Sequence, residues 1–392
     1  MKLQDKENEI GRDSSFVIRN ICSFISDYIK VCMQKIEFAV FLQMKNIVIL
    51  IYKNLTDKRL TESNVYTYNS DLLNSRSGNC FDALFYLYAF TKEKLKKDDT
   101  EINDILTTEC QYPTSSIFIT MLGKNIAYFF YYEKQWCSDI LLSIMEKDVN
   151  IQKAFWSGYF YSPYNTSKDL FDFLIEKRIY YKLFSLRITD SEHYQKMADI
   201  CTSAYLQGFD DITNEKSILK LYLDSKDLKF IDALINSFIL RKKAIDTKCE
   251  DKIVSIWGTI VGILKTLSDN QEITNIKIQL LQFVEVVSKI DQEILELIDF
   301  STIEISYYRV DYFFVSALLN IYSNDASSKE KIETIILNFT NTGTFFSDYD
   351  NKFSELFKLI MGNNKEVALQ IANIYKRHNE SKYLNILSGR QK

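Results

Sequence analysis

The residue types that most often perform acid–base or metal chemistry are scarce in this chain. Only two histidines, His193 and His378, occur among its 392 residues, and histidine is the commonest proton shuttle at neutral pH and the commonest metal ligand. A Ser-His-Asp or Cys-His site would have to recruit one of them, yet no Gly-x-Ser-x-Gly elbow or comparable local signature occurs. We therefore predict two helix-surface histidines, no catalytic residue and a protein that is not an enzyme.

Paired carboxylates are the remaining candidates for catalysis or metal binding. The stretch Ser347–Asn351 resembles the start of a calcium loop but lacks that loop's glycine and final glutamate, so we interpret it as the cap and first turn of the next helix. A metal-assisted enzyme with carboxylates between helices stays an alternative, although neither histidine has the glutamate three residues before it that such bundle sites use. The pairs are Asp98-Asp99, Asp210-Asp211, Glu293/Glu296 and Asp348/Asp350.

Cysteine and glycine patterns point away from bound cofactors. The seven cysteines are widely spaced and include no Cys-x-x-Cys pair, so neither a disulfide framework nor a zinc ribbon is encoded. No Gly-x-x-x-x-Gly-Lys or Gly-x-Gly-x-x-Gly phosphate loop occurs either. We expect no metal, no cofactor and a location in a reducing cytoplasm.

Aromatic side chains gather in one part of the chain. Tyrosines and phenylalanines fill positions 128–132, Trp136 follows, and a second dense run covers 155–161. Such rings commonly fill the seams between helices, and they also suit a concave surface that grips a protein partner. Base stacking is less favoured because basic companions are absent. The candidate partner-binding residues are Tyr128, Tyr131, Tyr132, Trp136, Trp156, Tyr159 and Tyr161.

Few residues in this chain can interrupt a helix. It has two prolines, Pro113 and Pro163, and ten glycines, where average usage would give roughly 20 and roughly 27. Gly and Pro provide the special backbone angles of turns, and no sustained two-residue alternation indicates a sheet. We predict an all-α protein that forms a degenerate solenoid of HEAT-like or TPR-like antiparallel helix pairs.

Apolar positions at intervals of three and four define the expected helices. Residues 14–55 form one long helix or two joined helices, a polar loop covers 56–79, and Thr114–Ser116 is an N-cap region. Gly258 and Gly262 lie on one helix face and suggest a close approach to another helix. Further helices are expected at 80–96, 101–109, 114–132, 134–147, 150–161, 167–178, 179–187, 190–207, 213–223, 227–244, 249–267, 271–289, 291–299, 302–323, 327–341, 349–361, 364–378 and 380–388.

The polar loop and the renewed helix pattern beyond residue 189 divide the chain. We expect an N-terminal helical segment (1–68), a helical region with the aromatic motif (69–189) and a C-terminal helical-repeat region (190–392). The last helix pair, within 364–388, is expected to cap the stack.

Charge and hydropathy limit the partners. The 48 basic and 52 acidic residues are evenly spread and give a net charge of −4, so nucleic acid is disfavoured, with a nucleic-acid-binding solenoid as an alternative. The basic runs Lys92–Lys97 and Arg241–Lys243 are expected at solvated helix ends. No signal-peptide pattern opens the chain, and the most apolar windows, 38–52 and 117–132, are too short to cross a bilayer. We expect no membrane association, and nothing in the sequence indicates an oligomeric state.

A packing motif runs through the aromatic part of the chain. It reads Leu122-Gly123-x-x-Ile126-Ala127-Tyr128, then Glu133-x-x-Trp136 and Leu141-Leu142, then Ala154-Phe155-Trp156-Ser-Gly158-Tyr159. This pattern resembles the helical C-terminal regions of large bacterial anti-phage defence proteins, with the best agreement over residues 70–190. In that family the region follows a sirtuin-like NAD-hydrolysing domain or a nucleotide-binding switch domain. The glycine-rich loop and the catalytic Asn and His of that effector domain have no counterpart here.

The resemblance implies the sensor or scaffold part of such a defence system, and convergence among helical repeats is the alternative. We expect a non-enzymatic helical-repeat protein that binds another protein. The implied partner is a phage protein or an associated effector.

Overall fold

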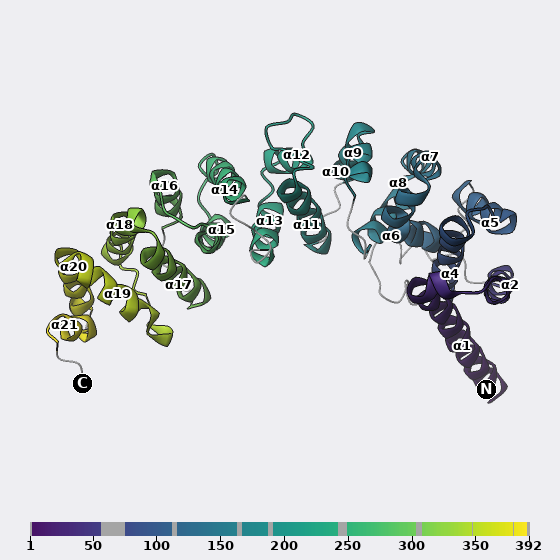
Figure 1. The fold of residues 1–392 in the computed structure, drawn as a ribbon, viewed down its shortest axis with the longest axis horizontal. Coiled ribbons are helices and arrows are strands. Elements are labelled where there is room, and N and C mark those ends of the chain that lie inside the picture. Colours follow the sequence, from purple (N-terminus) through teal and green to yellow (C-terminus); the bar gives the residue numbers. More distant parts are fainter. Residues whose placement is uncertain are drawn as a thin grey trace. The chain divides into compact units, whose positions relative to one another are not determined.

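The chain folds into helices throughout the part that can be placed. The computed structural model describes residues 2–55, 75–111, 116–162, 167–186, 191–241, 249–302, 308–346, 348–378 and 380–389. Every regular element in these ranges is a helix and none is a strand, which confirms the all-α prediction. The chain divides into two compact units, Met1–Ile188 and Thr189–Lys392, whose helices are labelled in Figure 1. The three-segment division expected from the sequence stays a prediction.

In the first unit, α4 connects α1 and α2 to the helices that follow. Helices α1 and α2 pack on α4, α4 packs on α6, and α6 packs on α8. All residues of α4 from Cys80 to Phe90 are buried, as expected for a helix that is apolar on every side. The elements of this unit are α1 (Lys2–Cys32), η1 (Met33–Lys35), α2 (Phe38–Lys53), α4 (Arg76–Phe90), η3 (Thr91–Leu95), α5 (Thr100–Gln111), α6 (Ser116–Tyr132), α7 (Lys134–Ile144), α8 (Val149–Phe160), α9 (Lys168–Glu176) and α10 (Ile179–Ser185).

A single carboxylate in α4 ties three helices of this unit together. Asp82 lies 3.3 Å from the Lys124 Nζ atom and accepts a hydrogen bond of 3.1 Å from Asn125, both on α6. The Lys30 Nζ atom on α1 lies 3.7 Å from the same carboxylate. Because a buried charge is costly unless it is paired, this cluster fixes the register of α1, α4 and α6.

Two glycines allow α6 and α8 to cross in backbone contact. A Cβ atom at Gly123 would overlap the carbonyl oxygen of Phe155, and one at Gly158 would overlap the carbonyl oxygen of Thr120. The missing side chain of each glycine therefore leaves room for the backbone of the other helix. These two glycines belong to the packing motif found in the sequence, so the motif marks a helix crossing.

The other glycine pair was interpreted wrongly from the sequence. Nothing lies within 4 Å of a Cβ atom built at Gly258 or Gly262 in α14. Gly262 is exposed, and the buried face of α14 consists of larger residues such as Trp257. The spacing of two glycines on one face does not show whether another helix lies against that face.

In the second unit, most of the longer helices pack on the next helix but one. The contacts run from α11 to α13, from α13 to α15 and from α17 to α19, and separately from α14 to α16, α18 and α20 in turn. The terminal helix α21 packs on α19 and α20. The elements are α11 (Ser191–Gln207), α12 (Ile218–Asp224), α13 (Leu228–Leu240), α14 (Glu250–Leu264), α15 (Gln271–Leu280), η6 (Leu281–Val286), α16 (Gln292–Ser301), α17 (Tyr308–Asn324), η7 (Ala326–Ser328), α18 (Lys329–Asn341), η8 (Tyr349–Asn351), α19 (Lys352–Asn363), α20 (Lys365–Arg377) and α21 (Lys382–Leu387).

Local hydrogen bonds move two helix starts away from the expected positions. Ser75 caps α4 by accepting from the Gly78 N–H, so the helix begins at Arg76 and the expected loop to residue 79 was too long. Helix α12 begins at Ile218 and not near residue 213, because the Asp211 side chain accepts from the Thr213 N–H and so favours a turn. The expected cap at Thr114 and most of the loop at 56–79 lie outside the described residues.

Candidate partner-binding surface

Two of the seven aromatic residues singled out in the sequence are interior residues. Trp156 is 0% exposed and Tyr159 is 4% exposed. The Tyr159 hydroxyl hydrogen bonds with the Tyr180 hydroxyl at 2.8 Å, and the Trp156 ring stacks on the Tyr180 ring at 5.9 Å. These two side chains anchor α8 to α10, which leaves them closed to a partner in this structure.

The other members of that set reach the surface to different extents. Tyr131, in the last turn of α6, is 78% exposed. Tyr128 and Tyr132 on α6 and Trp136 on α7 are half-buried. Tyr161 is also half-buried, just beyond the end of α8. We call Tyr128, Tyr131, Tyr132 and Trp136 the α6–α7 surface.

Ring contacts hold the α6–α7 surface in place. The Tyr132 ring lies 5.0 Å from the Tyr128 ring and 4.9 Å from the Tyr131 ring, both in edge-to-face arrangements. The Trp136 ring contacts the Tyr88 ring at 5.4 Å. Aromatic pairs in these geometries contribute about 0.5–1.5 kcal/mol beyond burial. The exposed ring of Tyr131 therefore projects from a rigid base of other rings.

Charged groups border these rings and are already paired. The Tyr128 hydroxyl donates to Glu93 at 3.2 Å, and burial, the neighbouring Tyr132 and Glu93 raise the pKa of Tyr128. Lys92 forms ion pairs with Asp98 and with Glu133, the latter at 2.9 Å. Burial alone would lower the pKa of Lys92, but these hydrogen bonds outweigh burial and raise it. The border is thus a fixed polar rim around an aromatic centre.

A pocket opens beside Trp136, between α5 and α7. Its volume is about 300 Å³, at the lower end of the range of roughly 300–1,000 Å³ for small-molecule sites. Burial raises the pKa of the Cys110 thiol, so this cysteine is protonated at neutral pH and is not a reactive thiolate. The lining residues are Thr107, Cys110, Gln111, Trp136, Asp139, Ile140 and Ser143.

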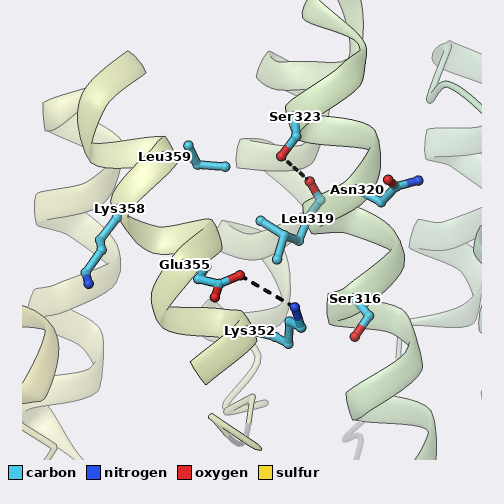
Figure 2. Close-up of a pocket in the computed structure, with 8 residues that line it drawn as sticks. All are labelled: Ser316, Leu319, Asn320, Ser323, Lys352, Glu355, Lys358 and Leu359. Atoms are coloured by element: carbon cyan, nitrogen blue, oxygen red, sulfur yellow. Dashed lines mark hydrogen bonds and ion pairs between the residues drawn. The ribbon is translucent and has the colours of Figure 1, made fainter. Parts of the chain in front are cut away.

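A larger groove lies between α17 and α19 in the second unit. Figure 2 shows its lining residues, and its volume is about 540 Å³. Glu355 pairs with Lys352 at 3.6 Å, and the Ser323 hydroxyl donates to the Leu319 carbonyl at 2.8 Å. The Ser316 hydroxyl oxygen is buried without a hydrogen-bond partner. The remaining lining residues are Asn320, Lys358 and Leu359, so the groove offers polar contacts to a ligand.

Members of three of the four carboxylate pairs serve structural roles, whereas Glu293 and Glu296 lie exposed on α16. Asp99 pairs with Lys45 at 2.6 Å, and Asp210 accepts from the Leu219 N–H at 3.0 Å near the start of α12. Asp348 accepts from the Ser354 N–H at 2.9 Å in the first turn of α19. This last contact agrees with the interpretation of Ser347–Asn351 as a helix start, although Ser347 itself lies outside the described residues.

The two histidines differ in their surroundings. His378 is exposed, and its ring lies 4.3 Å from the Phe345 ring. His193 is only 8% exposed, so the prediction of two surface histidines was wrong for this residue. The neighbouring Tyr194 hydroxyl donates to Asp227 at 2.6 Å, which shows that the first turn of α11 packs toward α13.

The described ranges contain no cluster of metal-ligating side chains and no membrane-spanning helix. There, no three His, Cys, Asp or Glu side chains lie close enough together to hold a metal ion. Among the same residues, no helix combines the length and the apolar character needed to cross a bilayer.

The sequence indicated Trp136 as a candidate but not the pocket beside it. Thr107, Cys110 and Gln111 are spaced by three and four residues, as are Trp136, Asp139, Ile140 and Ser143, so each set occupies one helix face. The sequence did not predict that α5 faces α7, because this pairing depends on contacts between residues that are far apart in the chain.

Comparison of the chain with protein-family models, with curated proteins and with solved structures finds no match.

Proposed function

We propose that this protein binds another protein through the α6–α7 surface. The observation that carries the proposal is Tyr131, which is 78% exposed and stands against the Tyr132 ring. Binding energy at interfaces concentrates on Tyr, Trp and Arg side chains that fill or flank a pocket. A rigid aromatic centre with a paired polar rim matches this pattern, and the pocket at Trp136 lies beside it.

We further propose that the helices form a degenerate solenoid. Support comes from the second unit, where α14, α16, α18 and α20 pack in succession and α17 packs on α19. Each helix pair in a solenoid contacts only its neighbours and leaves a long face for a partner. A protein-binding role needs such a face and needs no catalytic group.

The biological setting we propose is bacterial anti-phage defence in the cytoplasm. The resemblance of residues 70–190 to helical regions of such defence proteins supports this setting. The protein would act there as a non-enzymatic sensor or scaffold, and the partner would be a phage protein or an associated effector.

Quantitative affinity capture from the native cells, before and during phage infection, tests the binding role. We expect a specific protein to be retained by the wild type, and Tyr131→Ala to reduce its retention about tenfold or more, as for an interface hot spot. Tyr131 is exposed, so its removal leaves the fold intact.

Leu240→Ala is the matched control. Leu240 is 77% exposed but lies in α13 of the second unit. If wild type and Tyr131→Ala retained the partner equally, the α6–α7 surface would be excluded as the binding site. Equal loss of the partner with Tyr131→Ala and Leu240→Ala would exclude it as well.

A further inference from the structure

The pocket between α5 and α7 has a chemical character that selects its occupant. Of its lining residues, Asp139 alone is charged, and Trp136 alone is aromatic. Thr107, Gln111 and Ser143 add side-chain oxygen atoms that can accept hydrogen bonds. An aromatic ring beside a carboxylate attracts a cation, because the ring face and the carboxylate are both negative.

The two helices that form this pocket bring little positive charge to it. Helix α5 has no basic residue. On α7 the one basic residue, Lys134, is at the first position and pairs with Asp169 at 3.6 Å. A further cation near the pocket is Lys147, whose ammonium donates to the Gln111 carbonyl at 3.3 Å.

We infer that this pocket receives an arginine side chain of the partner protein. The inference deepens the proposed function and rests on it, since it names the chemistry by which the α6–α7 surface recognises its partner. A guanidinium group is planar, stacks on an indole ring and donates several hydrogen bonds in one plane. Trp136 supplies the ring, Asp139 the carboxylate, and the lining oxygens accept the remaining donors.

Arginine fits better than lysine or a small cation. The pocket has a volume of about 300 Å³, which suits one long side chain and is small for a cofactor. A lysine ammonium is a compact, strongly hydrated charge that makes poorer use of a flat ring and spread acceptors. The occupant is therefore an exposed arginine on a folded or extended protein segment.

Short capped peptides test this inference on the full chain. The probes are acetyl-Gly-Arg-Gly-amide and the same peptide with lysine, with glutamate or with citrulline, the neutral counterpart of arginine. Trp136 reports binding through its fluorescence, because the other two tryptophans, Trp156 and Trp257, are 0% exposed. Ligand-observed NMR gives a second readout that does not depend on tryptophan.

We expect a saturable response to the arginine peptide, a weaker response to lysine and none to citrulline or glutamate. Asp139→Asn should weaken arginine binding about threefold to fivefold, as for an exposed ion pair. Asp104→Asn is the matched control, because it removes the same charge from an exposed residue of α5 outside the pocket. Trp136→Leu should abolish the NMR signal while circular dichroism stays unchanged.

Citrulline binding as tight as arginine binding would overturn the inference. So would equal effects of Asp139→Asn and Asp104→Asn, or no arginine response by either readout. Loss of the captured partner with Tyr131→Ala, combined with no peptide response, would refute the arginine pocket and leave the proposed function standing. A peptide response with no captured partner would support the arginine pocket and refute the proposed function.

Discussion

At the scale of single residues, Asp348 lies in a sequence that resembles a metal-binding loop but stabilises the start of a helix instead. Its carboxylate accepts hydrogen bonds from the Ser354 N–H and hydroxyl and pairs with the Lys382 ammonium. Burial alone would raise the pKa of Asp348, but these partners outweigh burial and hold the pKa below its ordinary value. The ionised carboxylate therefore joins α19 to α21.

The stability of the second unit should depend on Asp348 in a pH-dependent way. A carboxyl pKa that is lower in the folded state stabilises the fold fully above the unfolded pKa of about 3.9, and this contribution is lost as pH falls through the folded pKa. We expect Asp348→Asn to lower the free energy of unfolding by about 1–3 kcal/mol at pH 7. Urea denaturation at pH 7 and at pH 3 should show this difference shrinking at the lower pH.

Asp350→Asn is the control for that measurement. Asp350 is exposed and adopts a left-handed backbone conformation with φ of 53°, which asparagine tolerates well. Its replacement should change the free energy of unfolding by less than about 0.5 kcal/mol. A difference between wild type and Asp348→Asn that stays constant with pH would contradict the assigned role.

Residue types in the sequence identified the aromatic set but not the burial of its members. Helices α6 and α8 carry apolar residues on nearly every side, so periodicity does not distinguish the covered faces from the open ones. Trp156 and Tyr131 consequently look alike in sequence, although one is 0% exposed and the other 78% exposed.

At the scale of elements, the crossing of α6 and α8 is the most specific contact in the first unit. Gly123→Ala or Gly158→Ala should destabilise the fold by about 3 kcal/mol or more, because the new methyl group meets backbone that cannot rotate away. Thermal unfolding followed by circular dichroism measures this effect. Tolerance of alanine at both positions would show that the helices do not cross in backbone contact.

The glycines of α14 provide the comparison. Gly258 and Gly262 have open space around the Cβ position, so alanine there should stabilise α14 by about 0.5–1 kcal/mol through helix propensity. We therefore expect alanine to lower the free energy of unfolding at Gly123 and Gly158 and to raise it at Gly258 and Gly262.

Helix positions were largely predictable from the sequence, whereas helix partners were not. The three-and-four spacing of apolar residues located α13, α16 and α20 to within a few residues. The Glu333 cluster was not foreseen. This buried carboxylate on α18 accepts hydrogen bonds from Tyr322 at 2.8 Å, Asn363 at 2.8 Å and Asn364 at 2.9 Å. Its hydrogen-bond partners are distant in the chain, so no local sequence pattern predicts this cluster.

At the scale of the whole molecule, scarce glycine and proline correctly indicated a chain of helices. The glycines that matter most, Gly123 and Gly158, serve packing. The α6–α7 surface is the exposed part of the aromatic set that was singled out from the sequence.

Site-specific photocrosslinking in the native cells tests the central claim most directly. A photoreactive amino acid replaces Tyr131 in one variant and Leu240 in another, since both side chains are highly exposed. The account predicts a discrete crosslinked partner at position 131, before or during phage infection, and none of that partner at position 240. No adduct at position 131, or the same adducts at both positions, would contradict it.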